Sequence, residues 1–238
     1  MSASRTARER ARAELTREIK EEARRQVAAE GAQGLSLRAV ARQLGMVSSA
    51  VYRYYPSRDS LLTALIIDAY DSLGAAVETA DAGQPRSDFR GRWRALCHSA
   101  RNWAVAGPHE YALIYGSPVP GYRAPQETIA PASRAGLILG RLLADAWAGH
   151  AISAVPAGPP MSAQLAGQAA TLAAAIAPAV PGPVVLRGLI AWTQLFGMIS
   201  FELFGQFVGI VDPADDFFSH AVGQMADFAG LPAVTVPG

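Results

Sequence analysis

The sequence predicts an all-α protein, with a small N-terminal three-helix unit followed by a larger helical region. Apolar residues recur at the helical spacing of three and four positions along most of the chain. No stretch alternates apolar and polar residues for long enough to predict a strand. Hydrophobic residues make up 50% of the 238 positions, so the chain can bury a substantial core.

The first predicted helix carries an apolar residue at every fourth position and ends near Gly31. Its apolar stripe consists of Leu15, Ile19, Ala23 and Val27. Residues 1–12 carry arginines and have no apolar stripe to anchor them: Arg5, Arg8, Arg10 and Arg12. We therefore expect residues 1–12 to form a flexible arm.

A glycine turn separates the second predicted helix from the third. The second helix has one apolar stripe, formed by Leu37, Val40, Ala41 and Leu44. Ser36 is placed to cap its first turn. Gly45 ends the helix, because glycine adopts the left-handed conformation without strain. Ser48 or Ser49 can cap the helix that follows.

The third predicted helix is short and faces inward through Val51 and Tyr55, which are four positions apart. The residues that point mostly away from the core are Ser48, Ser49, Arg53 and Tyr54. Pro56 cannot continue this helix, and Ser57 caps the next one. A buried stripe begins that helix, formed by Leu61, Leu62, Leu65 and Ile66.

Residues 35–62 together resemble the DNA-binding domain of the TetR family of transcriptional regulators. The segment AVYRYYPSRDSLL, residues 50–62, is similar to the family's recognition helix and to the start of its next helix. The glycine turn, the tyrosines, the proline and the basic residue match in register. The resemblance implies a helix-turn-helix DNA-binding domain at 1–56 and a helical regulatory domain at 57–238. From the residues alone, an ordinary helical hairpin is the alternative.

Seven further helices are predicted, separated by breaks rich in proline and glycine. We expect them at 58–79, 89–104, 109–115, 127–149, 165–176, 184–207 and 214–229, with a loop at 151–160. The last two are the most apolar, which favours dimerisation helices at 184–229; burial within one chain is the alternative. The segment AWTQLFGMISFELFGQF resembles the WHG-type C-terminal regulatory domain, except that Phe196 replaces the histidine of that pattern.

Charge and cysteine content narrow the choice of partners and compartment. Residues 1–62 hold 12 basic and 7 acidic residues, and the remainder holds 9 and 13. This segregation favours a head that binds DNA phosphates, with a merely solvated arginine-rich face as the alternative.

The single cysteine excludes an intrachain disulfide and favours a cytoplasmic location. The uncharged apolar run at 188–201 is shorter than the ~20 residues that cross a membrane, so we expect no membrane partner.

The resemblance implies that the recognition helix enters the major groove of double-stranded DNA. The predicted DNA-binding residues are Ser36, Arg38, Ser48, Ser49, Ala50, Tyr52, Arg53, Tyr54 and Arg58. Residues 48–50 are expected nearest the base edges, and Arg38 is the candidate for a guanine contact. Phosphate is assigned to Ser36, Tyr52, Tyr54 and Arg58, with burial as the alternative for Tyr52. The arginine arm could also reach the DNA backbone or the minor groove.

The predicted effector site is aromatic. Its candidate residues are Trp103, Tyr111, Tyr115, Tyr122, Trp147 and Phe196. Pockets of this composition bind small hydrophobic or aromatic compounds, although core packing is the alternative for each residue. The expected function is that of a ligand-responsive regulator, by family default a repressor. It would bind a palindromic operator as a homodimer and be released by its effector.

No catalytic, metal or cofactor site is expected. Cys97 and His98 are neighbours on a helix, so their side chains point about 100° apart and cannot pair. The four histidines have no metal-ligand spacing, and no phosphate-binding glycine loop is present. A helical small-molecule carrier without DNA binding remains as an alternative.

Overall fold

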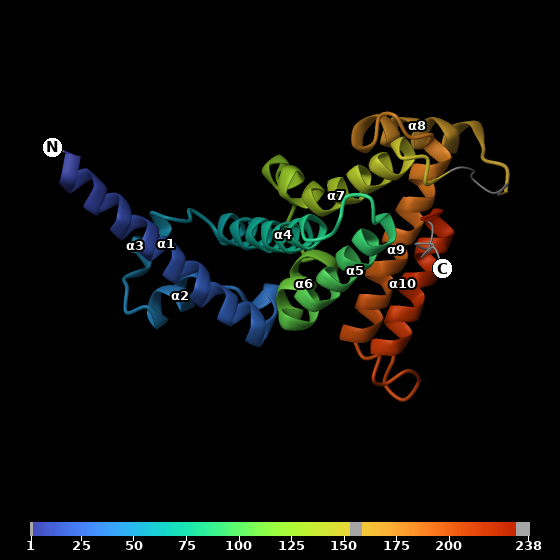
Figure 1. The fold of residues 1–238 in the computed structure, drawn as a ribbon. Coiled ribbons are helices and arrows are strands. Elements are labelled where there is room, and N and C mark those ends of the chain that lie inside the picture. Colours follow the sequence, from blue (N-terminus) through green and yellow to red (C-terminus); the bar gives the residue numbers. More distant parts are fainter. Residues whose placement is uncertain (1, 153–158, 232–238) are drawn as a thin grey trace. The chain divides into compact units, whose positions relative to one another are not determined.

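The structure, a computed structural model, describes residues 2–152 and 159–231, with side chains from Thr6 onward. Regular secondary structure in these residues is entirely helical, which confirms the all-α prediction (Figure 1). The α-helices are α1 (Ser2–Glu30), α2 (Leu37–Gln43), α3 (Ser48–Tyr52), α4 (Arg58–Ala82), α5 (Phe89–Ala106), α6 (Pro108–Tyr115), α7 (Ile129–Ala148), α8 (Ala163–Ile176), α9 (Gly182–Leu203) and α10 (Asp215–Ala229). Two short 3-10 helices are η1 (Ala32–Gly34) and η2 (Gln126–Thr128). The predicted loop at 151–160 falls mostly on 153–158, outside the described residues.

Most predicted helices agree with the observed ones to within a few residues, but α9 is shorter than expected. It ends at Leu203 rather than at 207. The chain then passes through turns over residues 204–210, and Gly205 has a φ of +80°. A left-handed glycine just beyond the last helical turn is a common helix terminator. Because the apolar stripe continues past Gly205, the sequence pattern predicts a helix end at 207 instead of Leu203.

The expectation of a flexible arm at 1–12 is wrong for residues 2–12, because α1 begins at Ser2. Residues 6–14 contain neither glycine nor proline and consist mainly of alanine, arginine and glutamate, which favour helix. One turn further, Arg17 pairs with Glu14 and, at 2.6 Å, with Glu21. A helix that is already nucleated by its buried stripe can extend without further tertiary contacts.

The chain forms two compact units, and each is described by itself. Unit 1 comprises Met1–Asp71 and Gly107–Pro131, and unit 2 comprises Ser72–Ala106 and Ala132–Gly238. This division differs from the domain boundary expected between residues 56 and 57. The first half of α4 belongs with the helix-turn-helix, because its apolar residues complete the core of unit 1. Residues 107–131, which are distant in sequence, also belong to unit 1.

Unit 1 is built around a core of α1–α4, on which residues 107–131 pack through Leu113, Ile114, Val119 and Tyr122. Polar contacts support this packing. Arg24 of α1 pairs with Glu110 of α6 at 3.4 Å and also with Asp68 of α4. The hydroxyl groups of Tyr122 and Thr63 lie 2.9 Å apart. The core of the three-helix head is thus completed by the first half of α4 and covered by α6 with the loop that follows it.

In unit 2 the centre of the core is α5. Trp93 is fully buried, and its indole Nε1 donates a hydrogen bond to the Val222 carbonyl of α10 at 3.0 Å. Arg92 is also fully buried, with its Nε 2.7 Å from Asp81 and its Nη1 2.8 Å from Asp145. A buried guanidinium is tolerated only when it is paired and hydrogen-bonded. These pairs therefore tie α5 to the end of α4 and to α7.

Two helices, α4 and α9, are long and apolar enough to cross a membrane by length and composition alone. Helices in the core of a soluble protein pass the same test. Of the apolar windows concerned, 50% in α4 and 44% in α9 are buried inside the protein.

Candidate nucleic-acid interface

Local hydrogen bonds set the geometry of the α2–turn–α3 hairpin. The Ser36 hydroxyl accepts from the Ala39 amide at 3.4 Å, which is the predicted N-cap of α2. Gly45 has a φ of +64°, in the left-handed region that the turn requires. The predicted cap of α3 is wrong, because Val47 occupies that position without a side-chain bond and Ser48 is the first helical residue. Ser48 and Ser49 are therefore not needed to cap the helix.

One side of α3 is anchored and the other is open to solvent. Val51 is 0% exposed and Tyr55 is 9% exposed, as the spacing predicted. Four of the nine predicted DNA contacts are exposed: Arg38, Ser49, Tyr52 and Arg53. Tyr52 is 43% exposed, so the alternative of a buried tyrosine is not realised. The hairpin presents a polar face of short and basic side chains.

The remaining residues of the predicted set are half-buried, and Tyr54 has a defined neighbour. Ser36, Ser48, Ala50 and Tyr54 all have intermediate exposure. The Tyr54 ring packs against the unit 1 core, and the Arg12 guanidinium carbon lies 5.4 Å from its centroid. This distance is within the range of a cation–π contact. Tyr54 therefore links the turn after α3 to the first turns of α1.

Arg58 requires a correction, because its guanidinium is engaged by the protein. Its Nη2 donates to the Ala32 carbonyl at 2.7 Å and to the Gln33 carbonyl at 3.4 Å, and its Nε donates to the Leu35 carbonyl at 3.2 Å. These carbonyls belong to η1 and the connection that leads into α2. We therefore reassign Arg58 from the phosphate contacts to the residues that position α2. These partners have no local sequence signal, because they lie more than 20 positions before Arg58.

Three of the six predicted effector residues come together in unit 1. Tyr115 lies between Tyr111, with ring centroids 5.2 Å apart, and Tyr70, at 6.3 Å with an edge-on geometry. Tyr122 joins the same region through its hydroxyl contact with Thr63. Burial, with a smaller contribution from Tyr70 and Tyr111, raises the pKa of Tyr115 well above its usual range. Tyr70 was missed, although it lies seven positions after Thr63 and hence on the same face of α4.

The other three predicted effector residues lie in unit 2, on different helices. Trp103 of α5 donates from Nε1 to the Ser72 hydroxyl at 3.0 Å, and Phe196 of α9 stacks at a tilt on Trp192 with centroids 4.8 Å apart. Trp147 is half-buried on α7. Since the six residues are divided between the two units, the expectation that they line one pocket is not met within either unit.

Unit 2 instead contains an apolar groove of about 370 Å³ between α7, α8 and α9. Its lining includes Leu137, Leu139, Leu143, Leu172, Ile176, Leu189 and Trp192. None of the six predicted residues lines it, because sequence reasoning selected aromatic side chains whereas the groove is mainly aliphatic. Trp192 is the one residue of this lining that an aromatic pattern could identify from sequence, since it lies one turn before Phe196 on the same helix.

Both halves of the chain match known protein families. The profile of the bacterial regulatory proteins of the tetR family matches residues 19–65, and that of the Tetracyclin repressor-like C-terminal domain matches residues 93–225. The chain is 40% identical over 205 residues to the HTH-type transcriptional regulator Rv1816 of Mycobacterium tuberculosis, covering 83% of this chain and 84% of that protein. It belongs to the TetR family.

Two other similarities agree with membership of the TetR family. The HTH-type transcriptional regulator Mb1846 of Mycobacterium bovis is also 40% identical, over 83% of this chain and 84% of its own. The crystal structure of the protein SCO4313 has a TM-score of 0.75 and 33% identity, covering 92% of this chain and 98% of that one. The resemblance seen in the residues of both halves of the chain is confirmed.

As a TetR-family protein, the chain is a DNA-binding transcriptional regulator and not an enzyme. Within residues 2–152 and 159–231, no group of three or more His, Cys, Asp or Glu residues could hold a metal ion. Cys97 is fully buried, and burial raises the pKa of its thiol well above the ordinary value, which disfavours the thiolate.

Proposed function

We propose that this TetR-family protein is a ligand-responsive repressor in the cytoplasm, which binds a palindromic operator as a homodimer. The observation that carries the proposal is the exposed polar face of α3, held on a rigid hairpin by Val51 and Tyr55. A short helix anchored on one side and open on the other fits a DNA major groove.

The proposed contacts divide into base-reading and phosphate-binding residues. Arg38, which is exposed on α2, is assigned to a guanine, because arginine pairs bidentately with its O6 and N7 atoms. Residues 48–50 begin α3 and approach base edges, and Arg53 extends the same face. Ser36, Tyr52 and Tyr54 are assigned to phosphates, which position the head without reading sequence. Few side chains in this set are long enough for bidentate bonds, so a single head has limited specificity.

A homodimer is supported by helices with two apolar faces. In α9 and α10, one face is buried in unit 2 through Leu195, Ile199, Phe218 and Val222. Other apolar side chains of the same helices are exposed, with Ile190 at 46%, Phe201 at 54% and Phe228 at 38%. Large apolar side chains exposed on neighbouring helices favour an interaction site at this surface. A second copy across a two-fold axis would cover these faces, so core packing and dimerisation are compatible.

The small residue in the middle of the exposed α9 face favours close approach of another helix. Gly197 lies between Ile190 and Phe201, and a methyl group added at this position would meet nothing within 4 Å.

The groove between α7, α8 and α9 offers space for a small hydrophobic or aromatic effector. Since α4 begins in unit 1 and ends in unit 2, a ligand that favours one orientation of α4 would change the spacing of the two heads.

The decisive experiment is selection of bound duplexes from a random pool with purified protein. The proposal predicts an inverted repeat whose half-sites lie about 34 to 36 Å apart, one helical turn. Binding should weaken as salt rises, because contacts to phosphate release counterions. A helical carrier that does not bind DNA would yield no sequence and no salt-dependent binding. Recovery of an unrepeated half-site would instead refute the homodimer on DNA.

A further inference from the structure

The first turns of α1 carry a basic stripe that continues the buried face of the helix. Arg8 and Arg12 precede Leu15 and Ile19 at spacings of four, three and four, so all four residues share one face. Ile19 is fully buried and Leu15 packs against the core. Residues 6–14, by contrast, are all exposed. The face that buries leucine and isoleucine in the core thus presents arginine where α1 extends beyond it.

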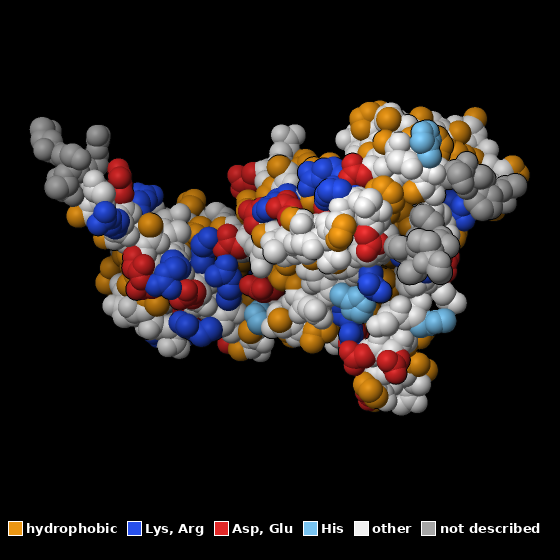
Figure 2. Space-filling model, in the orientation of Figure 1, with side chains coloured by type: hydrophobic (Ala, Val, Ile, Leu, Met, Phe, Trp, Pro, Cys, Tyr) orange, Lys and Arg blue, Asp and Glu red, His pale blue; other side chains and the backbone are white. Residues whose placement is uncertain are grey.

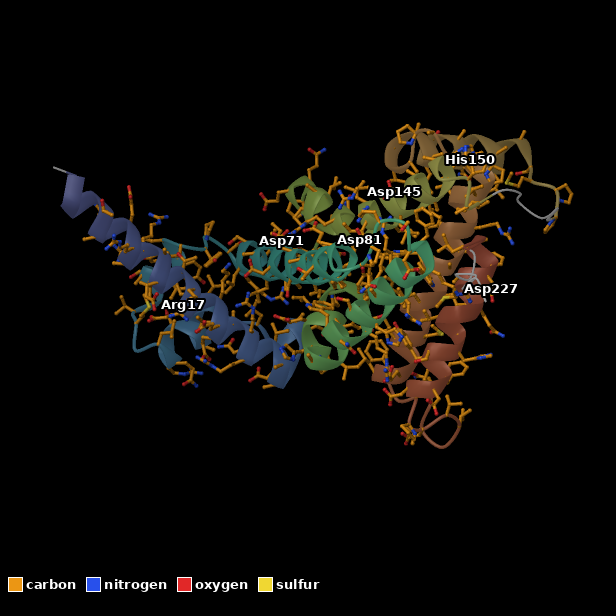
Figure 3. All side chains as sticks on the ribbon, viewed as in Figure 1. Arg17, Asp71, Asp81, Asp145, His150 and Asp227 are labelled. Atoms are coloured by element: carbon orange, nitrogen blue, oxygen red, sulfur yellow. The ribbon has the colours of Figure 1, made fainter. Side chains whose placement is uncertain are left out.

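The other side of α1 has a balanced charge. Arg17, labelled in Figure 3, pairs with Glu14 and with Glu21. Basic and acidic side chains also lie next to one another on the visible face of unit 1 (Figure 2). Among the described residues, no recorded ion pair includes Arg8 or Arg12. The positive charge of this stripe is therefore available to an external anion.

The basic stripe lies next to the turn that follows α3. The Arg12 guanidinium stacks over the Tyr54 ring, 5.4 Å from its centroid, and both residues belong to unit 1. Tyr54 is itself held against the core. The helix α1 is continuous from Ser2 to Glu30, so its first turns extend directly from the part of α1 that packs in the head. A duplex bound along the exposed face of α3 would therefore have Arg12 at its edge, with Arg8 about one helical turn further along α1.

We propose that Arg8 and Arg12 bind backbone phosphates of the duplex that α3 reads. This inference rests on the proposed function. Arginine suits phosphate because its planar guanidinium presents several donors in a fixed geometry. The two Cα atoms are about 6 Å apart along the helix axis, so each side chain can reach a different phosphate. Such contacts add affinity and fix the register of the head without adding base specificity.

Paired double variants of the full-length protein test this. The variant with Arg8→Gln and Arg12→Gln removes two charges from the basic stripe. The control with Arg10→Gln and Arg17→Gln removes the same charge from other faces of the same helix. Fluorescence anisotropy with the selected operator and with an unrelated duplex, over a series of salt concentrations, gives the slope of log K against log salt. Circular dichroism checks that both variants keep the wild-type helix content.

The first variant should lower the slope by about 1.8, since each lost phosphate contact removes about 0.9. Its affinity should fall by a similar factor for the operator and for the unrelated duplex, while the control keeps the wild-type slope. An unchanged slope in the first variant, or an equal change in both, would overturn this proposal and leave the proposed function intact. If the wild-type protein showed no salt-dependent duplex binding, the proposed function would fail as well.

Discussion

Replacing Arg58 with alanine should destabilise unit 1 while leaving its phosphate contacts unchanged. The two shorter hydrogen bonds, to the carbonyls of Ala32 at 2.7 Å and Leu35 at 3.2 Å, connect α4 to the chain that enters α2. A hydrogen bond from a charged group contributes about 1.5 to 3 kcal/mol. The Arg58 side chain is 31% exposed, so water compensates part of the loss. We therefore expect the free energy of unfolding to fall by about 2 kcal/mol.

Two measurements distinguish this structural role from a phosphate contact. Urea unfolding followed by circular dichroism gives the loss of stability, and anisotropy gives the salt slope of duplex binding below the unfolding transition. Arg58→Lys is the matched variant, because it keeps the charge but cannot reproduce the two bonds; it should lose most of the same stability. Arg53→Ala, at an exposed position, should not change stability. A slope lowered by about 0.9 with unaltered stability in Arg58→Ala would refute this reasoning.

Three further predictions test separate parts of the molecule. Arg38→Ala should relax the preference at one base position per half-site and cost about 1 to 3 kcal/mol there, measured by repeating the duplex selection; a uniform loss over all sequences would contradict a base contact. Phe201→Asp should convert the dimer to a monomer in light scattering, and a wild-type monomer would remove the proposed interface. Burial alone would raise the pKa of Asp81, but hydrogen bonds and charge from Arg92 and Arg86 outweigh it and lower that pKa. Its stabilising contribution is therefore complete at neutral pH and is lost as the pH falls through this lowered pKa. Asp81→Asn should remove that pH dependence and cost about 3 kcal/mol at neutral pH in urea unfolding, because it leaves the buried Arg92 with less compensation.

The helix-turn-helix could be predicted from sequence because its determinants are local. Ser36, Gly45 and Ser57 each fix a helix end through bonds or dihedral angles within three residues. The apolar spacing of α2 and α4 then assigns the buried faces. The start of α1 is different: the absence of an apolar anchor predicts disorder, whereas intrinsic helix propensity is sufficient to extend the helix to Ser2.

Contacts between residues distant in sequence could not be predicted. Arg58 bonds to carbonyls more than 20 positions before it, and Tyr122 meets Thr63 across 59 positions. Neither pairing has a periodic signal. The effector candidates were chosen by residue type, and packing separated Tyr115 from Trp103 into different units. A groove formed by three helices depends on how the helices approach one another, which spacing along one helix does not reveal.

The inclusion of residues 107–131 in unit 1 has a consequence for protein engineering. A fragment that stops at residue 71 would lack Leu113, Ile114 and Val119, and would expose the apolar surface that they cover. Glu110 would also be missing as a partner for Arg24. Chimaeric regulators that exchange heads at a single junction in α4 would therefore join mismatched surfaces. A stable exchange requires two grafted pieces, so recombination at one crossover would rarely transfer the operator preference of this chain intact.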